Sequence, residues 1–262
     1  MEQTIYKTLK QIEEDYHVKV LYACEAGSRA WGIASEVSDF DIRFIYIHHP
    51  THYLSIDPIG TGKKRDVIEL PVNNSLDVSG WDLIKALRLF RKSNPSLLEW
   101  IHSSIVYSKP YSTIHKLKKL LPSIFNPKEC IFHYLNMAKT NFRKCKRTAE
   151  PLESKTVINV IRPILIAKWI KEYDEFPPVE FTTLLDKLIS PGKVNESIHI
   201  LIKKKITTAS DNLEVNMDLI LAFAAKEMNV LEEYANRIDM KTPNCTKKLD
   251  RIFQETLGDV WE

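Results

Sequence analysis

The amino-acid sequence predicts an α+β protein, with a mixed β-sheet and flanking helices in its N-terminal part followed by a C-terminal helical bundle. Short runs of apolar, β-branched and aromatic residues, bounded by glycine, proline and acids, are concentrated in residues 1–107 and are typical of strands. From Ile114 onward, apolar residues recur at helical spacing and the connecting loops are short, as in a bundle. We therefore expect two domains, 1–107 and 108–262, with the SKPYS segment as linker.

The elements can be assigned in chain order from local patterns. Apolar residues recur at helical spacing between charged ones in residues 1–17, which predicts an amphipathic helix. A second amphipathic helix is expected over 81–92, and Asn94 followed by Pro95 predicts the N-cap and first residue of a third. The strand-like runs are 18–24, 42–47, 66–70 and 75–80, and the helices expected later are 130–150, 157–170, 181–189, 196–208 and a long final one over 212–238.

Length and composition exclude several classes of protein. The 262 residues are 44% hydrophobic and 27% charged, as in ordinary globular domains, and a net charge of +3 does not by itself indicate nucleic acid. The N-terminus has acids and lysines where a signal peptide needs an apolar core, and no run approaches the ~18 apolar residues of a membrane span. We expect a cytoplasmic protein with no membrane partner. The four cysteines lack CxxC spacing, which favours buried thiols.

Residues 18–47 carry the strongest functional signal in the chain. They predict two strands joined through a tight Gly27-Ser28 turn and a connecting segment, and the second strand opens with Asp39 and Asp41. Because side chains alternate along a strand, the two carboxylates should point to the same side. Glycine can adopt a positive φ and lets a ligand approach the backbone closely, so the turn is suited to holding a ligand.

Two carboxylates this close repel each other and need a compensating charge. Mg²⁺ is the obvious candidate, with Mn²⁺ as an alternative, because it takes one or two protein carboxylates and completes its octahedron with water and substrate phosphate oxygens. A glycine turn whose N–H groups face phosphates, beside such an acid pair, is suited to phosphoryl and nucleotidyl transfer. Asp-x-Asp alone most often only begins a strand after a loop; its combination with Gly-Ser between two strands favours a functional site.

These residues resemble a known family. The Gly27-Ser28 turn followed by DFDI matches the signature of the DNA polymerase β-like nucleotidyltransferase superfamily. GSRAWG…SDFDIRFIY, DVSGWDLIKALRLFRKSNPSLLEW and VIRPILIAKWI are similar to the bacterial predicted nucleotidyltransferases of the YcgL and RNA-ligase-associated branch, over about residues 20–171. The resemblance implies a catalytic domain of nucleotidyltransferase fold, a helical substrate domain, Mg²⁺, and transfer of a nucleoside monophosphate from a nucleoside triphosphate.

The resemblance also implies a set of acidic metal ligands. Asp39 and Asp41 would bind one or two Mg²⁺ ions, and a third carboxylate is expected on a later strand. Asp77, flanked by apolar residues, fits that position best, and Glu69 has the same pattern and is the alternative. Asp82 instead has the position of an acid in the first turn of a helix, where it is favoured by the helix dipole.

The remaining predicted site residues would contact the nucleotide. Gly27 and Ser28 would hold the triphosphate, and Arg29 and Arg43 flank the motif and would neutralise phosphate charge. Arg43 alternates to the side of Asp41, however, and could equally pair with it structurally. The GTGKK sequence at 60–64 lacks the residues that a Walker A loop requires and predicts a hairpin loop with exposed charges.

We expect an enzyme that transfers a nucleoside monophosphate from a nucleoside triphosphate to a hydroxyl acceptor and releases pyrophosphate. The expected nucleoside triphosphate is ATP. The acceptor is an RNA end, a protein or a small molecule, because a fold does not choose an acceptor. One alternative is a catalytically silent nucleotide- or RNA-binding module of the same fold. Another is a toxin–antitoxin or small-molecule-modifying transferase.

Two features of the helical part invite either a structural or a functional interpretation. Arg162 lies in a helix that is apolar nearly all round, where a charge needs a partner; a structural salt bridge is expected, with a phosphate or acceptor contact as the alternative. A basic stripe lies beside an apolar helix face and predicts a solvated surface, with an anionic-substrate rim as the alternative. The stripe consists of Lys139, Arg143, Lys146 and Arg147.

Overall fold

The computed structural model describes residues 1–57, 65–71, 75–147, 152–207, 215–239 and 244–262. The chain forms two compact units. Unit 1 comprises residues 1–30, 39–124 and 242–262, and unit 2 comprises residues 31–38 and 125–241. Unit 1 contains a mixed sheet with flanking helices and unit 2 contains helices, which confirms the predicted fold class.

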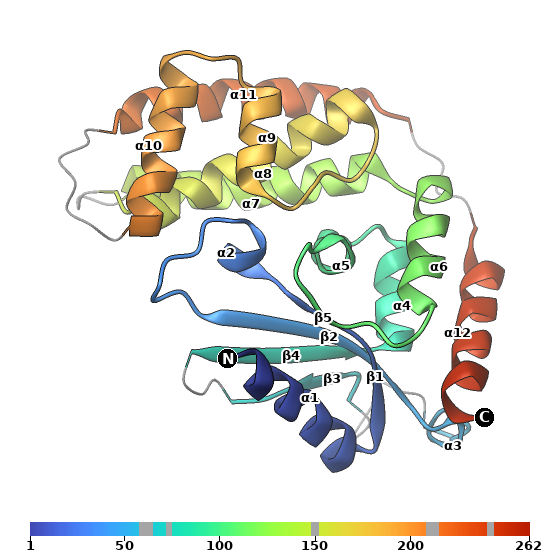
Figure 1. Ribbon diagram of the computed structural model, residues 1–262. Helices are drawn as coiled ribbons and strands as arrows, with labels where there is room; N and C mark the ends of the chain where they lie inside the picture. Colours follow the sequence, from blue (N-terminus) through green and yellow to red (C-terminus); the bar gives the residue numbers. More distant parts are fainter. Residues whose placement is uncertain (58–64, 72–74, 148–151, 208–214, 240–243) are drawn as a thin grey trace. The chain divides into compact units, whose positions relative to one another are not determined.

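Unit 1 is built on a five-stranded sheet with the strand order β3-β4-β2-β1-β5 (Figure 1). β2 pairs antiparallel with β1 and parallel with β4, while β3 and β5 add antiparallel edges. The parallel pairing matters for the site, because it brings the N-terminal ends of β2 and β4 to the same edge of the sheet. The strands are β1 (Val18–Glu25), β2 (Phe40–His48), β3 (Val67–Glu69), β4 (Leu76–Asp82) and β5 (Val106–Ser108).

Helix α1 (Glu2–Tyr16) packs against one face of this sheet (Figure 1). Its apolar stripe, Ile5, Leu9 and Ile12, is buried in one cluster with alternate residues of the strands. Ile42 and Phe44 of β2 belong to that cluster, so the odd-numbered residues of β2 face away from α1. This alternation determines which side of the sheet carries the polar residues.

Several other helices complete unit 1, and side chains cap the N-termini of some of them. Asp82 caps α4 through a hydrogen bond from the Ile84 N–H, and Asn94 caps α5 with Pro95 at the first position, as predicted. The predicted helix start at Trp81 was wrong, because β4 continues through Asp82. The helices are α2 (Gly27–Ala30), α3 (Pro50–Tyr53), α4 (Leu83–Arg91), α5 (Pro95–His102), α6 (Thr113–Leu120), the 3₁₀ turn η1 (Leu121–Ser123) and α12 (Thr246–Trp261).

The two units do not follow the predicted division at Tyr107. This residue lies inside β5, whose backbone pairs with β1, so the chain stays in unit 1 through Ile124. The C-terminal helix α12 was not expected from the sequence; it packs against α4 and α6 and also belongs to unit 1. Conversely, residues 31–38 belong to unit 2, although both flanking segments belong to unit 1.

Unit 2 is a helical bundle with α8 at its centre. α8 packs against four other helices and is buried around most of its circumference, because it is apolar nearly all round. Pro163 lies inside α8 and the helix continues past it. The five main helices are α7 (Pro127–Arg147), α8 (Ser154–Tyr173), α9 (Phe181–Leu188), α10 (Lys193–Thr207) and α11 (Met217–Arg237).

Arg162 is buried in α8 and is 3% exposed. Its guanidinium carbon lies 4.1 Å from the centre of the Trp31 ring, and its Nη2 donates to the Val179 carbonyl oxygen at 3.2 Å. Two of the partners of Arg162 are therefore an aromatic face and a carbonyl oxygen, which carry no formal charge. Trp31 in turn accepts a hydrogen bond at its carbonyl from the Phe181 N–H, which ties the segment 31–38 to the bundle.

Two further expectations concern residues outside the site. All four cysteines are free and buried, which confirms the expected buried thiols. Within the ranges that the structure describes, no helix combines the length and the apolar character needed to cross a membrane.

Candidate active site

The site is organised around the turn that follows β1. Gly27 has a φ of +58°, a conformation that side chains disfavour, and a Cβ at this position would overlap the carboxylate of Asp41. The Ala26 N–H donates to the Asp41 carbonyl oxygen at 2.8 Å, which fixes the turn against the start of β2. Both the backbone conformation and the lack of space therefore require glycine at position 27.

Asp41 and Asp77 lie side by side. They are direct partners in the parallel register of β2 and β4, and both face away from α1. Their side chains are 27% and 36% exposed, so solvent reaches both carboxylates. The rival residue, Glu69, lies on β3 opposite Ser79, and β4 separates it from β2. Of the two candidates for the third carboxylate, Asp77 is therefore the one that adjoins Asp41.

Asp39 lies just before β2 and is exposed. The pKa of Asp41 is raised from its ordinary value, mainly by partial burial, and Arg43 opposes this rise. The negative charges of Asp77 and Asp39 raise the same pKa further. The three predicted acids thus form one electrostatic group.

Arg43 lies between two of the acids and balances them. Its Nη2 donates to Asp77 Oδ2 at 2.7 Å and to Asp41 Oδ1 at 3.2 Å. Its Nη1 donates to the carbonyl oxygens of Asp77 and Ile42 at 3.2 and 3.1 Å. Of the two roles that the sequence leaves open for Arg43, the structure shows the pairing with carboxylates.

Arg29 and Ser28 belong to α2, the short helical turn that begins at Gly27. The guanidinium carbon of Arg29 lies 3.6 Å from the centre of the Phe40 ring, and its Nε donates to the Asp39 carbonyl oxygen at 3.1 Å. Ser28 is half-buried. Arg29 therefore connects the glycine turn to the backbone of the first predicted acid.

Glu25, at the end of β1, is a site residue that the sequence analysis missed. Its side chain is fully buried; Oε1 accepts the Asp41 N–H at 2.7 Å and Oε2 accepts the Tyr107 hydroxyl. Burial raises the pKa of this carboxyl. Glu25 holds β1, β2 and β5 together beside the turn. The available signal was an acid at the end of a buried strand, directly before the Gly-Ser turn.

The three acids provide hard oxygen ligands of the kind that Mg²⁺ takes. As they stand, they do not form a closed metal centre: the described part of the chain holds no cluster of three or more metal-binding side chains, and Arg43 bridges Asp41 and Asp77. One or two carboxylates suffice for Mg²⁺ when substrate phosphates supply the other ligands. The acids therefore fit Mg²⁺ bound together with a nucleotide, provided that Arg43 gives up its longer contact with Asp41.

Other candidate features lie away from these acids. His48, at the opposite end of β2, stacks on His52 with 3.8 Å between ring centres, and both line a cavity of about 580 Å³ with Arg65 and Glu69. The predicted 60–64 loop lies outside the residues that the structure describes.

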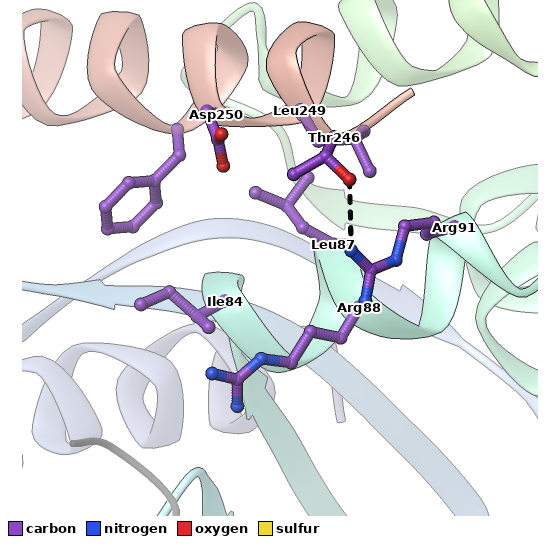
Figure 2. A pocket seen from close by; sticks show the side chains of 8 residues that line it. Ile84, Leu87, Arg88, Arg91, Thr246, Leu249 and Asp250 are labelled. Atoms are coloured by element: carbon purple, nitrogen blue, oxygen red, sulfur yellow. Dashed lines mark hydrogen bonds between the residues drawn. The ribbon is translucent and has the colours of Figure 1, made fainter. Parts of the chain in front are cut away.

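A second cavity, of about 290 Å³, lies between α4 and α12 (Figure 2). Apolar side chains of both helices line it, and Arg91 donates to Thr246 Oγ1 across it at 3.1 Å. Its lining includes none of the predicted site residues.

Comparisons with known proteins identify the family. Residues 1–255 match the model of the RNA repair pathway DNA polymerase beta family, RlaP. The chain belongs to this family. It is 39% identical over 262 residues, covering 100% of this chain and 98% of the relative, to the "Uncharacterized protein YcgL" of Bacillus subtilis (strain 168). The resemblance inferred from the motifs is confirmed.

Among solved structures, a nucleotidyltransferase-like protein from Exiguobacterium sibiricum is similar to this RlaP-family chain with a TM-score of 0.35 and 13% identity, over 86% of this chain and 75% of that chain. Membership of a DNA polymerase beta family supports a general nucleotidyltransferase role for the protein.

Proposed function

We propose that the protein is a Mg²⁺-dependent nucleotidyltransferase that transfers a nucleoside monophosphate from a nucleoside triphosphate to a hydroxyl acceptor. One observation carries this proposal: Asp41 and Asp77 adjoin each other in parallel register, directly beside a turn at which Gly27 leaves no room for a side chain. An acid pair next to a glycine turn is an arrangement suited to a metal-bound triphosphate.

Asp39 and Asp41 would hold Mg²⁺, with Asp77 as the third ligand, and the bound ion would stabilise the attacking and leaving oxygens. The turn at Gly27 and Ser28 would hold the triphosphate through backbone N–H groups. In the reaction, the acceptor oxygen forms a bond to the α-phosphorus, the bond from that phosphorus to the β-phosphate bridging oxygen breaks, and pyrophosphate leaves. Asp77 would orient the acceptor hydroxyl and accept its proton.

Arg29 and Arg43 would supply positive charge on either side of the acids. Arg43 can keep its short contact with Asp77 while its longer contact with Asp41 is exchanged for the metal, because the two carboxylates bind the same Nη2 separately. Arg29 would fix the Asp39 backbone through the hydrogen bond from its Nε.

The family's description favours an RNA end as the acceptor, since it places these proteins in RNA repair. A hydroxyl at an RNA terminus is a competent nucleophile for the proposed step. ATP is the proposed nucleotide.

A catalytically silent nucleotide- or RNA-binding module is the second candidate. The observation that favours it is the Arg43 guanidinium, which already balances Asp41 and Asp77. In such a module the arginine would permanently take the place of the metal.

The test is to incubate the protein with each α-labelled nucleoside triphosphate, Mg²⁺ or Mn²⁺, and RNA oligonucleotides, and to measure pyrophosphate release and label transfer. We expect metal-dependent transfer that is lost in Asp77→Asn and kept in Asp15→Asn, an exposed α1 acid on the other face of the sheet. Nucleotide binding without pyrophosphate release from any triphosphate would establish the silent module instead.

A further inference from the structure

The C-terminal part of α7 carries a concentration of positive charge. Residues 139–147 contain five lysines and arginines and no acid. Unit 2 as a whole is nearly balanced, with 18 lysines and arginines against 17 aspartates and glutamates. The charge in this segment is therefore segregated within a nearly neutral unit.

Four of these cations lie on one side of the helix. Lys139, Arg143, Lys146 and Arg147, the basic stripe, are spaced i, i+4, i+7 and i+8, which places them within a face about 100° wide. The adjoining face is buried, from Tyr134 to Cys145, so the helix cannot rotate to hide the stripe. The stripe runs along about 12 Å of the helix.

Among the described residues, the ion pairs account for one member of the stripe. Lys139 forms an ion pair with Glu232 of α11, with 2.6 Å between Nζ and Oε1. Arg143, Lys146 and Arg147 are exposed, and within the described ranges no acid forms an ion pair with them. Because these three side chains are exposed, a ligand can reach them.

An aromatic side chain lies beside these charges. Phe142 is half-buried, and the Lys146 ammonium lies 4.8 Å from the centre of its ring. Surfaces that bind single-stranded nucleic acid usually combine two components. Cations contact the phosphate backbone, and a neighbouring aromatic ring stacks on a base.

The helix dipole alone does not explain this pattern. Cations are favoured in the last turn of a helix, which accounts for Lys146 and Arg147. The dipole effect fades within that turn, so it does not account for Arg143 or for the lack of acids from residue 139 onward.

We propose that the basic stripe binds the phosphate backbone of the single-stranded RNA that serves as acceptor. This inference rests on the proposed function for the identity of the RNA as a substrate. Arg143 and Arg147 contact phosphates, and Phe142 provides a surface for a base. The sequence alone favoured a solvated helix face here; what changes the interpretation is the burial of the adjoining face, the exposed arginines and the aromatic neighbour.

The test measures equilibrium binding of a fluorescent single-stranded RNA of about 20 nucleotides at several salt concentrations, without nucleoside triphosphate or Mg²⁺. In the double variant R143A/R147A, the Kd should rise about tenfold, and the slope of log K against log salt should become shallower by about 1.4, or ~0.7 per lost phosphate contact. Both positions are exposed and helical, so alanine should leave the thermal midpoint close to that of the unmodified protein.

The matched control is K7A/K10A, which removes two exposed lysines of α1 in unit 1. It should keep both the Kd and most of the salt slope. Equal losses in the two double variants, or unchanged RNA binding in R143A/R147A, would overturn the proposal. So would binding of anionic lipid vesicles, but not of RNA, that depends on the stripe.

The RNA-binding measurement is independent of nucleotidyl transfer, because it is made without nucleoside triphosphate or Mg²⁺. Unchanged RNA binding in R143A/R147A together with intact pyrophosphate release would reject the RNA surface and leave the proposed function standing. Stripe-dependent RNA binding without transfer would reject the enzyme and keep the surface.

Discussion

Strand β4 has an aspartate near each end, and the two ends differ in what their carboxylate can do. At the N-terminal end, Asp77 is 36% exposed and pairs with Arg43. At the C-terminal end, Asp82 is fully buried, with Oδ1 accepting the Ile84 N–H and Oδ2 accepting the Tyr53 hydroxyl, both at 2.7 Å. Burial raises the pKa of Asp82 to about 6.

The difference shows that environment, and not residue type, decides whether a carboxylate is available for chemistry. Asp77 is accessible to solvent, so its carboxylate can take a metal ion or a proton while it stays paired with Arg43. Asp82 is committed to capping α4, and its hydrogen bonds are made by groups that are themselves fixed in the fold. Variants at the two ends should therefore fail in different ways.

The largest effect is expected from Asp41→Asn, which changes the carboxylate beside Asp77 at the N-terminal end of β4. Removing one negative ligand should reduce transfer by at least ~1,000-fold, because the metal is held less well and the developing charge loses its compensation. The fold should survive, since Arg43 keeps its 2.7 Å contact with Asp77. Pyrophosphate release and thermal unfolding followed by circular dichroism separate the two effects. A variant that does not fold would make the acid pair structural.

Gly27→Ala should damage both the fold and the activity. The alanine must adopt a φ near +58° and would overlap the Asp41 carboxylate, which together should cost about 2–5 kcal/mol in the free energy of unfolding. Urea denaturation measures this loss. Gly32→Ala is the matched control, because Gly32 has a φ of +72° with open space around it and should lose only the ~1–2 kcal/mol of the backbone term. Equal losses would show that the contact with Asp41 is unimportant.

The stability of the fold should depend on pH through Asp82, at the buried C-terminal end of β4. The pKa of Asp82 is raised from 3.8 to about 6 by burial, with the negative charge of Asp66 adding to the rise and the Tyr53 hydroxyl and Arg88 opposing it. The carboxyl group of Asp82 thus binds its proton more tightly in the folded protein than in the unfolded chain. The resulting stabilisation is fully present below pH ~4 and is lost as the pH rises to about 6.

Asp82→Asn lacks this titration while keeping an oxygen for the cap. The difference in unfolding free energy, parent protein minus variant, should therefore fall by ~1–3 kcal/mol between pH ~4 and ~6. Denaturant unfolding at several pH values measures it. A difference that stays constant with pH would mean that Asp82 is ionised throughout this range.

The smallest expected effect concerns Arg43. In Arg43→Met the acids lose their resident cation, so Mg²⁺ should raise the thermal midpoint by roughly 2–4 °C more than it does in the parent protein. Arg251→Met, which breaks an ion pair with Glu255 on α12, is the control and should show no added Mg²⁺ effect. An unchanged response in Arg43→Met would favour the silent module, in which the acids do not bind metal.

Local sequence patterns determined much of this protein. The alternating strand around Asp41, the amphipathic helix α1 and the Asn94 cap each depend on residues within one short window, so they could be predicted correctly. The Gly-Ser and Asp-x-Asp motifs likewise led to the family, because they are local.

Only the tertiary structure decided which distant residues meet. Asp77 is 36 positions after Asp41, and its place beside Asp41 depends on β4 pairing with β2 in one parallel register. Glu25 meets Tyr107, 82 positions later, because β5 joins the edge of β1. The return of α12 to unit 1 and the inclusion of residues 31–38 in unit 2 have the same origin. Periodicity encodes which face of an element is buried, whereas strand neighbours and register follow from the packing of the whole chain.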